Sequence, residues 1–260
     1  MFEATLTLAG LGLLFGGVLA LASKKLAVKV DPRIESVNHC LPGANCGACG
    51  YGGCFQFAEA VTRGEAPVSA CIPGGCEVSQ EVAEILGLGL EEQAERRAAA
   101  LLCLGDRDKT RVKFDYDGVQ DCKAAVLFDG GFKACPFACV GLGTCARSCP
   151  FDAIRMDDKK GLPLIDRGKC TGCGICAREC PKDVIALTSL KESPTVLCNS
   201  TAKGKEVRAQ CDIGCIGCGI CVKKCPEEAI TMEKNLALID KEKCTNCGIC
   251  VEKCPRDCIL

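Results

Sequence analysis

The longest apolar stretch lies at the amino terminus, where residues 4–22 (ATLTLAGLGLLFGGVLALA) carry no charged side chain. A stretch of this length is about the minimum for crossing the hydrocarbon core of a bilayer. Lys24 and Lys25 follow directly, whereas only Glu3 precedes it, and a cleaved export signal would carry its positive charge first. The pattern predicts an uncleaved transmembrane helix over residues 1–25, with the rest of the chain on the cytoplasmic side.

Shorter amphipathic patterns follow this stretch. Apolar side chains recur at helical spacing at positions 55, 58 and 61, and again at 78, 82, 85 and 86. These patterns predict a short helix after Cys54 and a second helix that begins at Glu77. A further helix is expected over residues 91–104, and the alternation of apolar and polar residues over 112–116 predicts a strand.

The cysteine content changes this picture, because 27 of the 260 residues are cysteine. Disulfide-rich secreted domains are short and have paired cysteines, whereas here the count is odd and no export signal is evident. Reduced thiols that bind metal are therefore expected. The single histidine, His39, excludes Rieske centres and facial-triad iron, which need two. The net charge of −1 gives no argument for nucleic acid.

The first cysteine group lies in a glycine-rich segment, LPGANCGACGYGGC, at residues 41–54. Cys46, Cys49 and Cys54 are close together, and Cys71 follows sixteen residues later, giving C-x2-C-x4-C-x16-C. Zinc ribbons use two close pairs, whereas three close ligands and one remote ligand suit a cubane cluster. The glycines allow the backbone to curl around such a cluster. These four cysteines are predicted to bind one [4Fe–4S] cluster.

The carboxy-terminal half contains an internal duplication. Nine cysteines recur in order, the first five 76 residues later and the last four 74 residues later. The first copies are Cys122, Cys135, Cys139, Cys145, Cys149, Cys170, Cys173, Cys176 and Cys180, and the second copies are Cys198, Cys211, Cys215, Cys221, Cys225, Cys244, Cys247, Cys250 and Cys254. Ile154, Leu164 and Ile165 and their copies Ile230, Leu238 and Ile239 predict a hairpin in each unit.

Three of the four half-units carry the C-x2-C-x2-C-x3-C-P run of bacterial ferredoxins, in which the fourth cysteine binds the neighbouring cluster. Three ligand sets follow from this rule. They are Cys215, Cys218, Cys221 and Cys254; Cys244, Cys247, Cys250 and Cys225; and Cys170, Cys173, Cys176 and Cys149.

The remaining half-unit departs from the run, because Leu142 occupies its second ligand position. Cys135 lies four residues before Cys139 and is the expected substitute. The fourth set is thus Cys135, Cys139, Cys145 and Cys180. Cys122 is the alternative to Cys135, and the two extra cysteines kept in both copies are otherwise structural.

Together these sets predict five [4Fe–4S] clusters, or about twenty iron atoms per chain. A sixth cluster is left open, because several cysteines have no assigned role: Cys40, Cys76, Cys103, Cys122, Cys198, Cys211 and Cys258. No nucleophile or acid–base constellation is visible. The sequence therefore predicts electron transfer and no catalytic residues.

Charge is distributed unevenly along the chain. Residues 1–121 hold 11 basic and 16 acidic side chains, and residues 122–260 hold 21 and 17. Several lysines of the basic half lie close in sequence to predicted ligands, namely Lys223, Lys224, Lys241, Lys243 and Lys253. They are a candidate docking surface for a small acidic ferredoxin, although they also fit an ordinary solvated face. The first cysteine module is a competing docking site.

The order of these features resembles the B subunits of Rnf electron transport complexes. The resemblance covers the whole chain, from the single span through LPGANCGACGYGGC to the ferredoxin modules, and CNSTAKGKEV at 198–207 is similar to the long form found in anaerobes. It implies a complex in a bacterial cytoplasmic membrane that moves electrons from reduced ferredoxin to NAD⁺ and pumps Na⁺ or protons outward. The chain would receive the electrons of ferredoxin and contact flavin-bearing and multi-span membrane subunits.

The expected fold is α+β, with a single transmembrane helix, a small [4Fe–4S] module and two tandem 2[4Fe–4S] ferredoxin-like units. The expected boundaries are 1–25 for the anchor, 26–90 for the first module, 91–121 for a connector, and 122–190 and 191–260 for the two units. Two other functions stay open. One is a membrane-tethered polyferredoxin that serves another redox enzyme, and the other is a reductase that resets a redox-sensing transcription factor.

Overall fold

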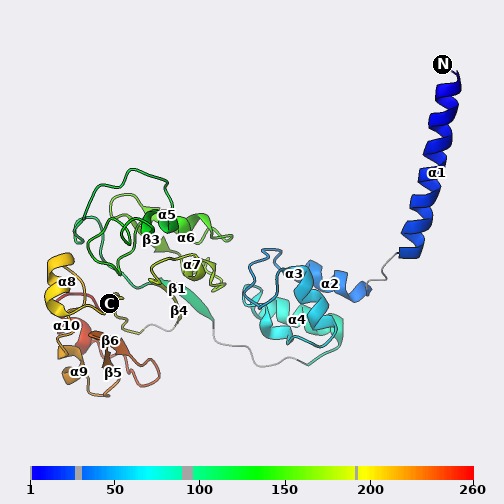
Figure 1. Cartoon of the computed structure of the whole chain (residues 1–260). Coiled ribbons are helices and arrows are strands. Elements are labelled where there is room, and N and C mark those ends of the chain that lie inside the picture. Colours follow the sequence, from blue (N-terminus) through cyan, green and yellow to red (C-terminus); the bar gives the residue numbers. More distant parts are fainter. Residues whose placement is uncertain (1, 27–30, 90–95, 191–192) are drawn as a thin grey trace.

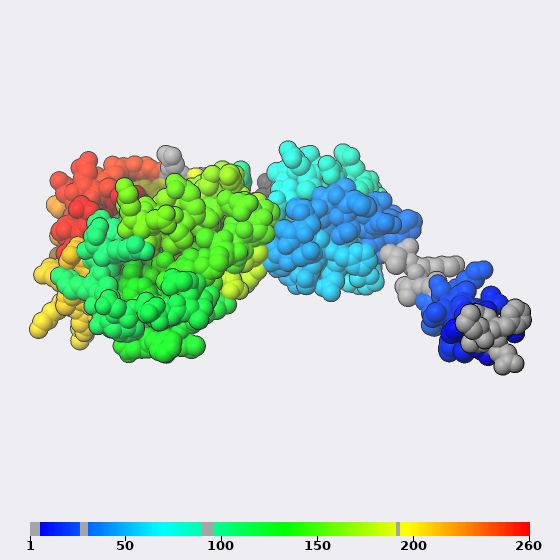
Figure 2. All heavy atoms as spheres, turned by 90° about the horizontal axis from the view of Figure 1, so that it is seen from above, coloured from blue at the N-terminus to red at the C-terminus, as the bar shows by residue number. Residues whose placement is uncertain are grey.

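The computed structural model describes residues 2–26, 31–89, 96–190 and 193–260. Helices and strands both occur, and the strands form three two-stranded antiparallel sheets among these residues. Figure 1 shows an isolated amino-terminal helix, a small helical module and then the two ferredoxin-like units. In the space-filling view the helix, the helical module and the pair of ferredoxin-like units follow one another, and the first unit overlaps part of the second (Figure 2).

The amino-terminal helix α1 (Phe2–Leu26) stands apart from the other elements (Figure 1). Its segment Leu6–Leu26 has a mean hydropathy of 2.0 and no buried residue. Leu13 and Leu19, for example, are 80% and 68% exposed. A helix of this length with apolar side chains on every face is a candidate membrane span, as the sequence predicted.

The helical module packs three helices and one turn of 3₁₀ helix around a small core. The elements are α2 (Pro32–Cys40), α3 (Cys54–Thr62), η1 (Val68–Ala70) and α4 (Gly75–Leu86). Helix α3 and helix α4 confirm the two amphipathic patterns read from the sequence. Val37, Phe57 and Val82 are almost fully buried where these helices meet.

Two predictions for the connector are wrong. Residues 97–101, expected to be helical, form strand β1 (Arg97–Leu101), which pairs antiparallel with β4 (Ile185–Ser189); residues 90–95, which include the start of that expected helix, lie outside the described residues. The alanines 98–100 fit the buried face beside β4, and this pairing overrides their helix propensity. The strand expected over 112–116 is reduced to one isolated bridge between Val112 and Lys133.

The duplication is visible as two similar units, each with short helices and one hairpin. The first contains α5 (Cys122–Val126), α6 (Thr144–Arg147), β2 (Ile154–Asp157), β3 (Leu162–Ile165) and α7 (Ile175–Arg178), followed by β4. The second contains α8 (Gly204–Gln210), α9 (Ile220–Lys224), β5 (Ile230–Glu233), β6 (Leu236–Ile239) and α10 (Ile249–Glu252).

The predicted hairpins are confirmed by equivalent registers, in which Ile154 pairs with Ile165 and Ile230 pairs with Ile239. The two-residue difference between the copies lies in the hairpin turn, which has four residues in the first unit and only Lys234 and Asn235 in the second. Both of these have positive φ, as tight two-residue hairpins require. The deletion therefore leaves the cysteine loops unchanged.

The connector lies against both units. The backbone N–H of Leu102 donates to the carbonyl of Val184 in the first unit (2.7 Å). The backbone N–H of Asp212 in the second unit donates to the carbonyl of Lys109 (2.8 Å). Residues 102–110 thus join the two units by main-chain hydrogen bonds.

Candidate metal centres

The local geometry of each cysteine run depends on left-handed residues between its cysteines. The residue before the second ligand position has positive φ in every run, as Gly141, Gly172, Gly217 or Asn246. At Gly172, an added Cβ would lie 2.5 Å from the carbonyl oxygen of Arg97, so only glycine fits there. This conformation turns successive thiols toward one side of the loop.

The two units bring cysteines together in four cavities, each lined by cysteines from two runs. The cavities contain Cys149, Cys170, Cys173 and Cys176; Cys225, Cys244, Cys247 and Cys250; Cys215, Cys218, Cys221, Cys254 and Cys258; and Cys122, Cys139, Cys145 and Cys180. Their empty volumes are similar, from 310 to 350 Å³. The crossing of the fourth cysteine to the neighbouring set is present in each unit.

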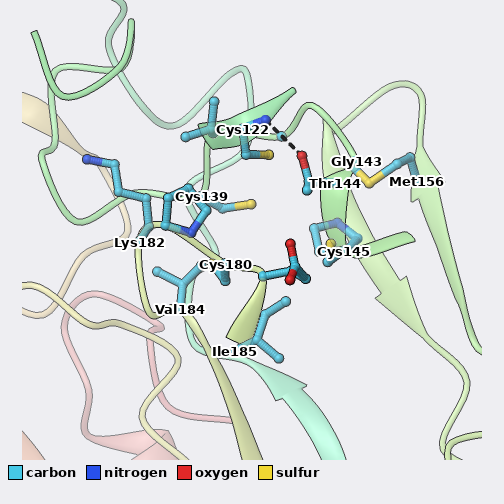
Figure 3. Close-up of a pocket in the computed structure, with 15 residues that line it drawn as sticks. Cys122, Cys139, Gly143, Thr144, Cys145, Met156, Cys180, Lys182, Val184 and Ile185 are labelled. Carbon is cyan, nitrogen blue, oxygen red and sulfur yellow. Dashed lines mark hydrogen bonds between the residues drawn. The ribbon is translucent and has the colours of Figure 1, made fainter. Parts of the chain in front are cut away.

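At the incomplete run, the structure brings in the alternative cysteine that the sequence had left open. Cys135 does not reach the cavity of Cys139, Cys145 and Cys180; Cys122 lies there instead (Figure 3). The loop around Leu142 keeps the conformation of a complete run, and Leu142 packs against an apolar cluster that includes Cys122. The structure thus brings a thiol from helix α5 to the cavity of the loop that lacks one.

A hydrogen-bond network positions Cys122. Asp121 caps α5 by accepting from the backbone N–H groups of Lys123 (2.8 Å) and Ala124 (3.0 Å). Thr144 donates its hydroxyl to Asp121 Oδ2 (2.9 Å), and its oxygen accepts from the backbone N–H of Cys122 (2.8 Å). The cap and the cysteine are thereby fixed to α6, the helix that carries Cys145.

In the helical module, Cys46, Cys49 and Cys54 lie near Cys71. Burial raises the pKa of Cys71 to about 11, and the negative charges of the other three thiolates add to this shift. Asn45 Oδ1 accepts from the backbone N–H of Cys54 (2.8 Å) and so fixes the loop at the start of α3. The structure therefore brings the predicted set together.

The donor sets fit a cluster better than a single ion. Among the residues that the structure describes, no three cysteine, histidine or acidic side chains converge closely enough to hold one metal ion. The thiols instead surround a space, as the corners of a cubane require. Burial raises the pKa of Cys145 and Cys221 to about 11 and that of Cys176 to about 12. These thiols are therefore protonated at neutral pH without iron, and each releases its proton when it binds iron.

A backbone donor from the connector also reaches one of these thiols. The N–H of Ala99 in β1 points at Cys170 Sγ (3.3 Å). Hydrogen bonds to ligand sulfurs are one of the factors that set cluster potentials. The strand that the sequence pattern predicts as a helix is therefore part of this site.

Sequence reasoning also missed a fifth cysteine-lined cavity, between the two units. It contains Cys103, Cys135, Cys198 and Cys211. Sequence spacing assigns no role to Cys103, Cys198 or Cys211 and places Cys135 in another set. The retention of the extra cysteine pair in both copies was the available signal.

Comparison with known families agrees with this arrangement. The Fe-S cluster family model matches residues 41–73, and the 4Fe-4S dicluster domain model matches residues 138–184 and 214–258. The chain is therefore an iron–sulfur protein with ferredoxin-type domains.

Curated relatives match nearly the whole chain. The B subunit of a proton-translocating ferredoxin:NAD(+) oxidoreductase complex of Clostridium ljungdahlii is 46% identical over 90% of this chain and 82% of the relative. The B subunit of an ion-translocating oxidoreductase complex of Methanosarcina acetivorans is 41% identical over 94% and 92%. The B subunit of a Na(+)-translocating ferredoxin:NAD(+) oxidoreductase complex of Acetobacterium woodii is 42% identical over 95% and 74%. The chain therefore belongs to the family of B subunits of Rnf-type ion-translocating oxidoreductase complexes.

Proposed function

We propose that this chain receives electrons from reduced ferredoxin and passes them along [4Fe–4S] clusters within a membrane-bound, ion-translocating ferredoxin:NAD⁺ oxidoreductase complex. Each bound cluster would supply reversible one-electron transfer. The observation that carries this proposal is the series of cysteine-lined cavities of similar volume along the two units. No residue of the chain is assigned acid–base or nucleophilic catalysis.

The proposed ligands of five clusters are the sets named above, with one change from the sequence assignment. Cys122, and not Cys135, completes the set of Cys139, Cys145 and Cys180. The cavity lining supports this change. The remaining proposed sets are Cys46, Cys49, Cys54 and Cys71; Cys149, Cys170, Cys173 and Cys176; Cys215, Cys218, Cys221 and Cys254; and Cys225, Cys244, Cys247 and Cys250.

Contacts between neighbouring sets support a path from the first module into and through the first unit. Arg178 Nη2 donates to the carbonyl oxygen of Cys46 (2.7 Å), which places the first loop against the first unit. Within that unit, the charge of Cys145 contributes to the raised pKa of Cys176, after burial and nearer thiolates. Adjacent ligands of this kind keep the transfer steps short.

We also propose that α1 anchors the chain in the cytoplasmic membrane, with the cluster-binding parts on the cytoplasmic side. Lys24 and Lys25 in its last turn support this orientation. The anchor would place the cluster units beside the other membrane and redox subunits of the complex. The division into an anchor (1–25), a first module (26–90), a connector (91–121) and two units (122–190 and 191–260) is part of this proposal.

The proposed docking surface for ferredoxin lies on the second unit. Cys218 and Cys247 are exposed, so that their sites reach the surface. The lysines of this unit that lie near the ligands are exposed too: Lys223, Lys224, Lys241, Lys243 and Lys253. Attraction between these lysines and the acidic side chains of a small ferredoxin would mainly accelerate association and make its rate sensitive to salt.

Stopped-flow reduction of the membrane complex by reduced ferredoxin tests this proposal. We expect the second-order rate to fall as salt rises, and to fall by about tenfold or more when Lys223 and Lys224 are both changed to Glu. Lys159→Glu with Lys160→Glu is the matched control, since it makes the same charge change at exposed lysines in the first unit. A rate that neither salt nor the Lys223/Lys224 reversal changes would exclude the second unit as the dock.

A further inference from the structure

The fifth cysteine-lined cavity lies between the two ferredoxin-like units and belongs to none of the five ligand sets. Cys103, Cys135, Cys198 and Cys211 line it, and its empty volume of about 350 Å³ equals that of the cavity lined by Cys122. Cys103, Cys135 and Cys211 are buried, and Cys198 is half-buried. The cavity thus has the volume and the four thiols of the proposed cluster sites.

Its cysteines come from three parts of the chain and lie outside both dicluster matches. Cys103 belongs to the connector and Cys135 to the first unit, whereas Cys198 and Cys211 belong to the second. The duplication explains which extra cysteines are available. In the first unit Leu142 leaves one loop position without a thiol, and Cys122 lies in that cavity instead. In the second unit Cys218 occupies the equivalent loop position. Cys198, the copy of Cys122, is therefore available for another site.

Polar hydrogens point at three of these four sulfurs. The backbone N–H of Cys139 lies 3.4 Å from Cys103 Sγ, and that of Ser200 lies 3.5 Å from Cys198 Sγ. The hydroxyl of Thr110 lies 3.8 Å from Cys211 Sγ. Sulfur that bears negative charge as a metal ligand is stabilised by such donors.

A buried lysine beside the cavity pairs with no carboxylate among the described residues. Lys133 is 7% exposed, and its Nζ donates to the carbonyl oxygen of Gly105 (2.7 Å), a residue that lines the cavity. No carboxylate lies within 4 Å of it in the part of the chain that the structure describes. An ammonium group buried in this way is costly unless negative charge lies nearby, and four thiolates holding a cluster carry that charge.

We propose that Cys103, Cys135, Cys198 and Cys211 bind a sixth [4Fe–4S] cluster, which connects the two ferredoxin-like units. Each thiol gives up its proton to water and binds one iron atom, displacing a thiolate of the carrier protein that delivers the preassembled cluster, so that no oxidation state changes. A cubane suits the site better than one metal ion, since no three described ligands converge on a point. The protein-bound cluster carries two negative charges in its oxidised state, which Lys133 partly neutralises.

The site lies between a proposed cluster ligand of the first unit and one of the second. Cys139 is a proposed ligand in the first unit, and its N–H points at Cys103 Sγ. On the other side, the backbone N–H of Cys215, a proposed ligand in the second unit, donates a hydrogen bond to Cys198 Sγ. The sixth cluster therefore lies beside one cluster of each unit and closes the gap between them.

Iron and acid-labile sulfide analysis of the full-length chain, prepared without oxygen in detergent, tests this inference. We expect about 24 iron atoms per chain, against about 20 for five clusters. Cys198→Ser with Cys211→Ser should remove about four iron atoms and one spin from the reductive EPR titration. Cys40→Ser with Cys76→Ser is the matched control and should remove none, because neither cysteine lines one of these cavities.

Zinc in stoichiometric amount, or about 20 iron atoms in the unaltered chain, would overturn the proposal without any variant being needed. Equal iron in the double variant and the unaltered chain would overturn it as well. If the double variant does not fold, Cys135→Ser separates the two sites: loss of the sixth cluster's signal alone supports the proposal, and loss of a first-unit signal alone contradicts it. These outcomes do not depend on whether ferredoxin is the electron donor.

Discussion

Cys258 differs from the other cysteines near the clusters, because it lies in a cluster cavity that already contains four proposed ligands. By the duplication it corresponds to Val184, and both side chains are almost fully buried. Its hydrogen bond to Cys215 and its burial raise its pKa, so it stays a thiol. Its Sγ also lies 3.6 Å from that of Cys254. Cys258 is thus a packing residue that donates S–H to a ligand sulfur.

We expect Cys258→Val to leave the iron content unchanged and to lower the reduction potential of this cluster by about 20 to 60 mV. That range corresponds to one hydrogen bond of about 0.5–1.5 kcal/mol for a one-electron couple. The potential falls because the lost donor stabilised the more negative, reduced state. EPR-monitored titration measures it.

Cys258→Ser is the control for that experiment, since a hydroxyl keeps a donor at the same place and should give a smaller shift. Loss of iron from the valine variant would instead make Cys258 a ligand.

At the scale of elements, the five-residue helix α5 is too short to be stable by itself, yet it supplies a proposed ligand. Its stability depends on the Asp121 cap and on the hydrogen bonds of Thr144. The N–H of Ala124 and then the Thr144 hydroxyl lower the pKa of Asp121 below its ordinary value of 3.8. The cap is therefore fully formed above that pH and is lost as the pH falls through the lowered pKa.

We expect Asp121→Ala to cost about 1 kcal/mol of stability at neutral pH and to release iron faster from the Cys122 site than from the others. Iron loss to a chelator, followed over time together with thermal unfolding, measures both effects.

Asp157→Ala provides the comparison, because Asp157 Oδ1 also accepts from two backbone N–H groups, those of Lys159 and Lys160 (3.0 Å each), in a turn that carries no ligand. Equal rates of iron release in the two variants would show that the cap does not hold Cys122.

At the scale of the whole molecule, the parts of the chain differ in what stabilises them. The helical module has an apolar core with Phe57, Val61 and Val82, whereas in the cores of the two ferredoxin-like units cysteines stand beside the aliphatic side chains. We therefore expect the folding of both units to depend on bound clusters. Helix α1 takes no part in either core.

Deletion of residues 1–26 should accordingly give a brown protein that stays in solution without detergent and keeps all of its iron. The reason is that α1 is the single helix among the described residues that is long and apolar enough to span a bilayer. Membrane flotation and iron analysis of the deleted and full-length chains, expressed without the partner subunits, measure this. A deleted chain that still floats with membranes would contradict a single anchor.

The sequence by itself determined whatever depends on neighbouring residues. The candidate span at residues 4–22, the helices α3 and α4, both hairpins and three ferredoxin runs follow from local periodicity and spacing. Cysteines three residues apart on one tight loop line the same cavity whatever surrounds the loop. The ferredoxin run extended this reasoning to the crossing of the fourth cysteine.

Only the tertiary structure decided the features that depend on distant segments. Residues 97–101 form a strand because β4, far along the chain, pairs with them in a register that sets Leu101 opposite Ile185. Cys122 takes the place at Leu142, and Cys135 meets Cys211 and Cys103, because the packing of the two units and the connector brings these thiols together. Sequence spacing does not predict contacts between residues that are far apart in the chain, because these contacts depend on how the intervening segments pack.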